Sequence, residues 1–250
     1  MPTIVAPTST IAATPPDRPV VIVRTIRSLT ANRSATCVTA VAGVKYAATL
    51  SAWNAPASGN FGSASIAYYS SSGLGVLARR ESIYTYEHAI DNIRGTDALL
   101  INFSSADFAL NQISIGWFSN DADVSILRYT GTSAPALGNS TVANLGNAAG
   151  WDWVGDYSTL STNSTLNFNT GNDARTAAWW LVSTYNSAYS TVPVSGSFGD
   201  ANDYFKLKGF SGSVIASVPP SSDVPEPGTF ALFGIALIGF AAARRTLRAK

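Results

Sequence analysis

Cysteine, histidine and charged residues are scarce in this chain of 250 residues. The one cysteine, Cys37, excludes an intramolecular disulfide framework and a cysteine-rich metal site. The one histidine, His88, comes with neither a Gly-X-Ser-X-Gly nucleophile motif nor a cysteine partner, so a triad hydrolase is not indicated. We interpret His88 as a bystander or a turn-stabilising residue.

Only 12% of the residues are charged, whereas glycine, serine, threonine, asparagine and alanine are abundant, as in secreted β proteins with many turns. The hydrophobic fraction of 46% is enough for a buried core. The first 45 residues and the C-terminal tail are basic, and residues 46–223 are acidic. Arg94, Arg128 and Arg175 of this acidic body stand singly, and its bases form no phosphate-tracking stripe, so we expect no nucleic acid partner.

An uncharged, apolar segment at residues 229–243 lies near the end of the chain. It is slightly shorter than the roughly 20 residues that a spanning helix needs. Arg244, Arg245 and Arg248 follow it, and such side chains extend to the membrane surface and keep their end of the helix cytoplasmic. Since the large apolar residues surround the helix instead of forming one stripe, an amphipathic or core helix is the weaker interpretation. We predict a transmembrane helix at 229–243, with the acidic body outside.

Pro225, Glu226 and Pro227 precede this segment, and the two prolines should keep the triplet extended and accessible. The triplet, the apolar segment and an arginine pair, in this order, resemble the PEP-CTERM sorting tail of Gram-negative bacteria. The resemblance implies that exosortase, an integral-membrane cysteine transpeptidase-like enzyme, removes the tail and passes the protein to the cell surface or extracellular polymer. The three residues are then a substrate of another enzyme and have no catalytic role.

Export requires a signal, and the first 45 residues contain no clean one, because basic residues interrupt both apolar stretches. We predict that residues 1–44 are an atypical leader outside the fold, which is explained by a misassigned start or by an unusual signal. The expected organisation continues with a β domain at 45–216, a linker at 217–223 and the sorting tail at 224–250.

The body contains short, turn-bounded segments that are typical of strands, and in residues 111–118 Ile113, Ile115 and Trp117 alternate with Ser114 and Gly116. The expected strands are 48–54, 63–70, 98–103, 111–118 and 123–129, with related segments at 150–157, 177–185 and 203–215. About eight strands in one domain predict an all-β fold, a single antiparallel β-sandwich of jelly-roll type.

The body also resembles a recurrent family of exosortase-dependent surface proteins. The resemblance rests on "GLGV" (73–76), "EHAIDN" (87–92), "DALLINF" (97–103), "ISIGW" (113–117), "DADVSIL" (121–127) and "DYFKL" (203–207). It implies a β domain placed before a PEP-CTERM tail, with no established biochemical activity.

The loop "EHAIDNIRGTD" is the sharpest polar cluster of the body. Asp91, Asn92 and Asp97 could supply the oxygen ligands that calcium takes, or they could form a plain Asx turn with a capping aspartate. Asp121 and Asp123 alternate as in a cation loop but lack the glycine and distal glutamate of an EF-hand, which favours solvated turn carboxylates. No cofactor is certain, and calcium is the one candidate.

Six tryptophans raise the question of carbohydrate binding. Exposed rings could serve as sugar platforms, and the candidates are Trp151, Trp153, Trp179 and Trp180. In a strand the adjacent Trp179 and Trp180 face opposite ways, so one of them should lie outside the main core.

The sequence as a whole predicts an exported, non-enzymatic surface or extracellular-matrix protein, with an inner-membrane intermediate and exosortase as its processing partner. The alternatives are a lectin-like module that binds exopolysaccharide, with or without calcium, and a glycan-active enzyme with Glu81 and Glu87 as its carboxylate pair.

Overall fold

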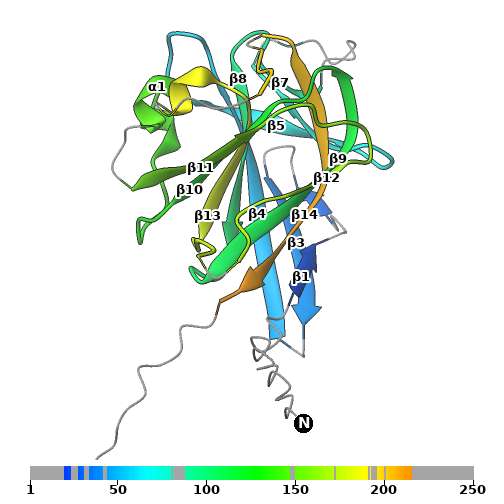
Figure 1. The fold of residues 1–250 in the computed structure, drawn as a ribbon, viewed down its shortest axis with the longest axis vertical. Coiled ribbons are helices and arrows are strands. Elements are labelled where there is room, and N and C mark those ends of the chain that lie inside the picture. The colour runs from blue at the N-terminus through cyan, green and yellow to red at the C-terminus, as the bar shows by residue number, and fades with distance from the viewer. Residues whose placement is uncertain are drawn as a thin grey trace, which may run out of the picture. The chain divides into compact units, whose positions relative to one another are not determined.

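Figure 1 shows a computed structural model of the chain. The described residues are 20–23, 28–30, 34–41, 44–79, 81, 88–146, 150–171, 173–190, 192, 196–199 and 201–215, and up to residue 46 the description is of the backbone alone. The chain divides into a unit of residues Met1–Ile215 and a unit of residues Ala216–Lys250. The second unit, which includes the sorting triplet, the predicted helix 229–243 and its flanking arginines, lies outside the described residues. Among the described residues, no helix is long and apolar enough to cross a membrane.

The regular structure of the body is mostly antiparallel β, which confirms the predicted all-β class. All eight predicted strand segments are strands. They are β4 (Val44–Ala55), β5 (Gly62–Tyr69), β8 (Thr96–Phe103), β9 (Phe108–Asn120), β10 (Val124–Tyr129), β11 (Trp151–Tyr157), β13 (Trp179–Thr184) and β14 (Asp203–Val214). The others are β1 (Val20–Val23), β2 (Ser28–Thr30), β3 (Ser34–Val41), β6 (Gly73–Leu77), β7 (Ile90–Asp91) and β12 (Thr165–Asn167).

The first three strands lie in the segment for which the sequence predicts a leader. β1 pairs with β14, and β3 pairs with β2 and β4. The division into leader, body, linker and tail stays a prediction.

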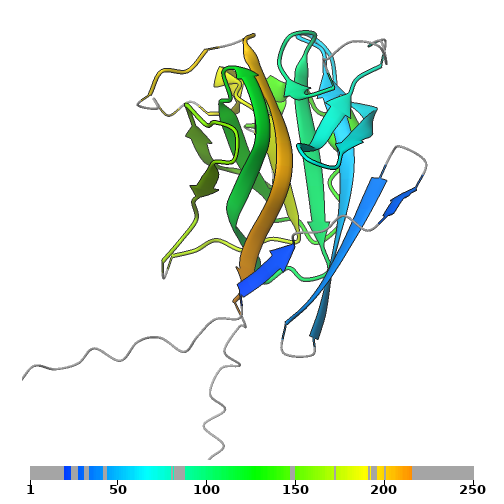
Figure 2. The same ribbon diagram turned by 90° about the vertical axis from the view of Figure 1, so that its right-hand side faces the viewer.

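The strands form one continuous sheet, whereas the predicted jelly-roll sandwich has two separate sheets. The order of the strands in the observed sheet is β11-β10-β13-β8-β4-β5-β6-β14-β9-β12. β5 makes the turn between the two halves, because its first residues pair with β4 and its remaining residues pair with β6. Figure 2 shows β9 and β14 side by side on one side of the curl, with β4 and β8 on the other.

The main core fills the inside of the curl. Leu50, Leu99 and Ile101 of one half and Ile113 and Leu207 of the other are almost fully buried there. Burial of this apolar area, at about 25 cal/mol per Å², is the principal force that holds the two halves together.

A second cluster covers the outer face of β8, β10 and β13. Its cover includes η1 (Leu137–Asn139), α1 (Val142–Leu145) and η2 (Ser187–Tyr189), which contribute buried apolar side chains. They pack near Ala98, Leu100 and Leu181, all buried on the side of the sheet that faces away from the main core. Burial on both faces explains why "DALLINF" is a nearly continuous apolar run.

The predicted alternation in β9 holds for Ile113 and Ile115 but is wrong for Trp117. Ile115 pairs with Leu207 and Trp117 with Lys206, so Gly116 is an extra residue in the ladder. This β-bulge turns Trp117 away from the main core. On the outer side of the sheet, the centroid of its ring lies 4.1 Å from Lys206 Nζ.

The turn between β5 and β6 closes over this bulge. A Cβ atom on Gly116 would lie 2.1 Å from the Ser72 carbonyl oxygen, so only glycine permits the approach. The Tyr69 ring then lies 4.3 Å from Lys206 Nζ on the outer surface of the sheet. Burial lowers the pKa of Lys206, and two aromatic faces offset part of the cost of burying its charge.

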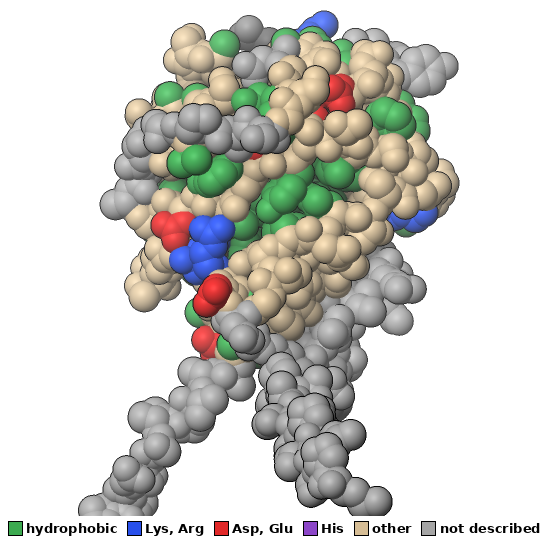
Figure 3. Space-filling model, in the orientation of Figure 1, with side chains coloured by type: hydrophobic (Ala, Val, Ile, Leu, Met, Phe, Trp, Pro, Cys, Tyr) green, Lys and Arg blue, Asp and Glu red, His purple; other side chains and the backbone are tan. Residues whose placement is uncertain are grey.

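The visible face of the body carries few charges. In Figure 3 it consists mainly of uncharged polar side chains and backbone, with a hydrophobic area near the centre and a few basic and acidic side chains next to one another on the left.

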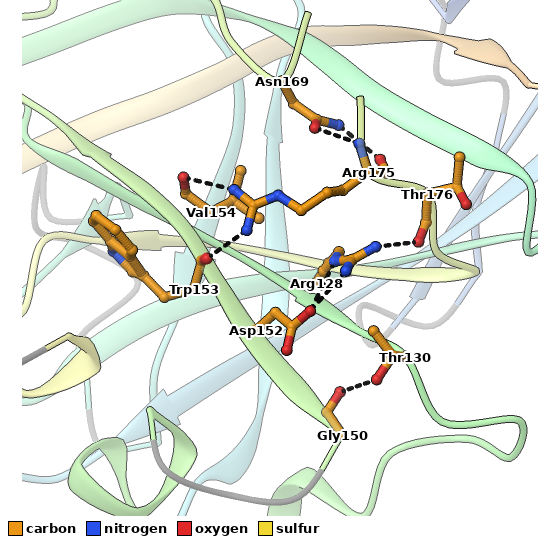
Figure 4. A network of polar contacts seen from close by, with 9 residues as sticks. All are labelled: Arg128, Thr130, Gly150, Asp152, Trp153, Val154, Asn169, Arg175 and Thr176. Atoms are coloured by element: carbon orange, nitrogen blue, oxygen red, sulfur yellow. Dashed lines mark hydrogen bonds and ion pairs between the residues drawn. The ribbon is translucent and has the colours of Figure 1, made fainter. Parts of the chain in front are cut away.

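Two arginines secure the edge strand β11, as Figure 4 shows. Arg128 Nη2 lies 2.7 Å from Asp152 Oδ2 across the β10–β11 ladder, and Arg128 Nη1 donates to the Thr176 carbonyl. Arg175 donates through Nη1 to the Trp153 carbonyl and through Nη2 to the Val154 carbonyl, at 3.0 and 3.1 Å. The register between β10 and β11 shifts at this point, which marks a β-bulge in β11. The Arg175 guanidinium therefore binds carbonyl groups of an edge strand that could otherwise pair with a strand of another chain.

Replacing Arg175 by alanine should lower the free energy of unfolding by about 1.5 kcal/mol, because two charge-assisted hydrogen bonds to β11 are lost. Arg175→Lys, which cannot reach both carbonyls with a planar fork, should lose about half of that. Denaturant unfolding measures the effect, and exposed Arg94→Ala is the charge-matched control. Equal stability of the Arg175→Ala and Arg94→Ala variants would show that this contact is not needed.

Candidate functional site

A polar pocket lies at the corner where β5 changes its partner from β4 to β6. Its volume is about 890 Å³. It is lined by Asn54, Pro56, Asn60, Gly62, Ser63, Ala64, Ser65, Leu77, Ala78, Arg79 and Glu81. The polar groups are therefore amides, hydroxyls, one guanidinium and one carboxylate.

Three carboxylates meet beside this pocket. Oxygens of Glu81, Asp91 and Asp97 lie within 4.8 Å of one another. Asn54, from the pocket wall, donates from Nδ2 to Asp97 Oδ1 at 2.9 Å, and the Asp91 amide donates to Asp97 Oδ2 at 3.3 Å. Burial, reinforced by the charge of Asp91, raises the pKa of Asp97 well above its usual range.

Asn92, which the sequence groups with Asp91 and Asp97, lies elsewhere. Its side chain makes two hydrogen bonds with Asp203 of β14. Asn92 Nδ2 donates to Asp203 Oδ2 at 2.5 Å, and the Asp203 amide donates to Asn92 Oδ1 at 3.0 Å. The predicted calcium loop is thus split between two groups of carboxylates, and Asn92 joins the second.

The second group is formed by Asp121, Asp123 and Asp203, whose oxygens also lie within 4.8 Å of one another. Asp203 Oδ1 accepts the Asp123 amide at 2.8 Å, and the two oxygens of Asp123 accept the amides of Thr159 and Gly199. Asp123 and Asp203 have no exposed surface, and Asp121 is half-buried. Of the two residues that the sequence interpreted as solvated turn carboxylates, Asp121 and Asp123, the second is therefore not solvated.

Burial is the main cause of the raised pKa values in this second group of carboxylates. It raises the pKa of Asp203 to about 7, with a further contribution from the charge of Asp123, and it also raises the pKa of Asp123. Within the described part of the chain, the ion pair found joins Arg128 and Asp152, and no base pairs with Asp121, Asp123 or Asp203. Three close carboxylates without a base can take up a proton or hold a divalent cation.

Sequence reasoning did not foresee that Glu81 joins the first group and Asp203 the second. Asp203 begins the last strand, far along the chain from Asp121 and Asp123. No local pattern connects them, because the contact arises only when β14 pairs with β9.

The single histidine is buried, at 7% exposure, and among the described residues its Nδ1 has no hydrogen-bond partner. It is absent from the lining of the pocket. Glu87, the predicted partner of Glu81 in a glycosidase pair, lies outside the described residues.

The four tryptophan candidates divide between the two faces of the sheet. Trp180 is fully buried in the main core, whereas half-buried Trp179 packs on the outer face, which confirms that one of the pair lies outside that core. Trp151 is also buried, and its ring centroid lies 5.1 Å from that of Tyr129. Only Trp153 and Trp179 retain partial exposure, and both pack against the second cluster, which favours a packing role over a sugar platform.

Comparison with known proteins identifies the C-terminal tail. Residues 223–245 match the PEP-CTERM protein-sorting motif, so the chain carries this motif at its C-terminus, as the resemblance predicted. The motif implies a protein that is exported through the membrane, targeted to exosortase and sorted to the cell surface, a type that is generally non-enzymatic. No curated protein matches the chain.

Calcium should raise the melting temperature if either group of carboxylates holds the ion. A site with a Kd of about 10⁻⁴ M gives about 2 kcal/mol at a few millimolar calcium, which is several degrees for a domain of this size. Asp91→Asn should abolish the rise if the first group is the site, and Asp121→Asn if the second is. An unchanged melting temperature between EDTA and millimolar calcium would assign both groups to structure alone.

Proposed function

We propose that this protein is a non-enzymatic component of the cell surface or extracellular matrix, delivered there after exosortase removes its tail. The observation that carries the proposal is the sorting motif at residues 223–245, placed after a β body that ends at β14. Pro225, Glu226 and Pro227 are the residues that exosortase recognises, and the segment 229–243 spans the inner membrane before cleavage. Arg244, Arg245 and Arg248 hold the tail with its C-terminus in the cytoplasm.

A structural or adhesive role is supported by the construction of the body. Its apolar side chains lie in two clusters on opposite faces of one sheet, and its edge strand β11 is held by arginine contacts. Its visible face is weakly charged and mainly polar, without a continuous basic surface for nucleic acid. Such a body suits repeated contact with neutral polar polymers outside the cell.

The glycan-active alternative has a weaker basis. The Glu81 carboxylate accepts the Ala78 amide at 2.8 Å and lies close to Asp91 and Asp97. These contacts support a structural function for Glu81. The lectin-like alternative is favoured by one observation, the polar pocket at the β4–β5–β6 corner.

The experiment that tests the proposed function replaces Pro225, Glu226 and Pro227 by alanine and follows the protein through cell fractions. Retention in the inner membrane supports the proposal, and normal release contradicts it.

A further inference from the structure

We propose that the polar pocket at the β4–β5–β6 corner binds a neutral saccharide. This assignment gives the adhesive role a ligand class and therefore rests on the proposed function. The volume of the pocket, about 890 Å³, lies within the range of about 300 to 1,000 Å³ that is typical of small-molecule sites.

The chemistry of the lining matches hydroxyl-bearing ligands. A sugar hydroxyl both donates and accepts, and the pocket offers the same pair of capacities through Asn54, Asn60, Ser63 and Ser65. Among the described residues, the lining includes no aromatic side chain, and its apolar part consists of Pro56, Ala64, Leu77 and Ala78. A peptide with large apolar side chains would therefore find no deep apolar subsite.

Two polar groups of the wall are held in place before any ligand arrives. Asn54, a residue of the lining, is fixed by the hydrogen bond that its Nδ2 donates to buried Asp97. Glu81 is fixed by the hydrogen bond that its Oε2 accepts from Ala78. Groups that are already ordered lose little conformational entropy on binding, so even a weakly binding sugar can be retained.

The electrostatics favour a neutral ligand over an acidic one. Among the described residues of the lining, Arg79 is the one base and Glu81 is the one acid. A carboxylate oxygen of Asp91 lies within 4.8 Å of one of Glu81, and its charge adds negative potential. A chain of uronic acids would meet this potential with its own negative charges, whereas an uncharged chain would not.

The test is isothermal titration calorimetry of the purified full-length protein with short gluco-, galacto- and mannooligosaccharides, and with oligouronates for comparison. At least one neutral series should bind saturably, and the oligouronates should bind at least about tenfold more weakly. A triple variant Asn60→Ala, Ser63→Ala, Arg79→Ala should lose at least about tenfold in affinity, since each removed hydrogen bond is worth about 1 kcal/mol. Asn60, Ser63 and Arg79 are exposed, so the fold should tolerate these changes.

Two further variants sharpen the result. Ser63→Trp should block the pocket by filling it, without removing any contact of the core. A matched triple variant outside the pocket, Arg94→Ala, Ser133→Ala, Asn139→Ala, alters exposed residues of similar type and should bind as the original does.

The proposal is overturned if no neutral oligosaccharide binds saturably, if oligouronates bind more tightly, or if the triple pocket variant keeps full affinity. Binding is measured on purified protein, whereas sorting is measured in cells, so a failure of this proposal is distinguishable from a failure of the proposed function.

Discussion

Replacement of Pro225, Glu226 and Pro227 by alanine should hold the uncleaved protein in the inner membrane and leave its body folded. These residues form the core of the matched sorting motif and lie outside the unit that contains the sheet. Alanine removes the fixed backbone angles of both prolines and the charge of Glu226, so the processing enzyme loses its recognition element. Because the apolar segment and its arginines remain, the membrane anchor should persist.

Cell fractionation and immunoblotting measure this effect as a loss of nearly all released protein and an accumulation of the full-length form. A double variant, Pro219→Ala and Pro220→Ala, changes two nearby prolines outside the matched residues and should be released normally. Release of the triple variant at the normal rate would show that the motif does not direct processing in this protein.

The free energy of unfolding should rise by about 3 kcal/mol when the pH falls from 8 to 5 in EDTA. Asp203 has a pKa of about 7 in the folded protein, whereas an aspartate in an unfolded chain has one of about 3.9. Between these values the folded state binds a proton that the unfolded state does not, so acidification favours folding. The contribution is present below pH 7 and is lost as the pH rises through 7.

Asp203 alone should account for about 2 kcal/mol of the change, because the range from pH 8 to 5 covers only part of the interval between its folded and unfolded pKa values, and the raised pKa of Asp97 adds to it. For a domain of this size the total corresponds to roughly 6 to 12 °C in melting temperature.

Asp203→Asn, which imitates the protonated side chain, should flatten the pH dependence by the share of Asp203. Exposed Asp107→Asn changes the same charge at the surface and should leave the dependence unaltered. Melting curves between pH 5 and 8 decide the matter. A stability that is constant over this range, or that falls on acidification, would contradict the assignment of a shared proton to the second group.

The two predictions about cations and protons are connected. A calcium ion and a proton compete for the same carboxylate oxygens, so a calcium-dependent rise in melting temperature should be smaller at pH 5 than at pH 8. This comparison applies to both groups of carboxylates.

Much of the strand structure could be predicted from the sequence, because the alternation of side chains is local. Ile113 and Ile115 lie in the core as their spacing indicated, and Trp179 and Trp180 lie on opposite faces. The prediction for Trp117 failed because an extra residue in a strand reverses every later face, and whether Gly116 would form a bulge depended on how β14 paired with it.

The candidate sites likewise divide into those that a local stretch of sequence specifies and those that depend on the fold. The sorting motif is a linear signal, so Pro225, Glu226 and Pro227 are identifiable without any structure, and the comparison at residues 223–245 confirms the motif. The sequence by itself therefore determined the sorting motif, the export that this motif implies and the position of most strands.

Only the tertiary structure decided which strands are neighbours and which polar residues meet. Asp203 joins Asp123 and Asn92, Glu81 approaches Asp97, and Asn54 connects the pocket to the buried carboxylates. The physical reason is that periodicity reports the face of a strand but not its partner. The partners are chosen when the sheet curls over its core, and residues more than a hundred positions apart, such as Asn92 and Asp203, are then joined by hydrogen bonds.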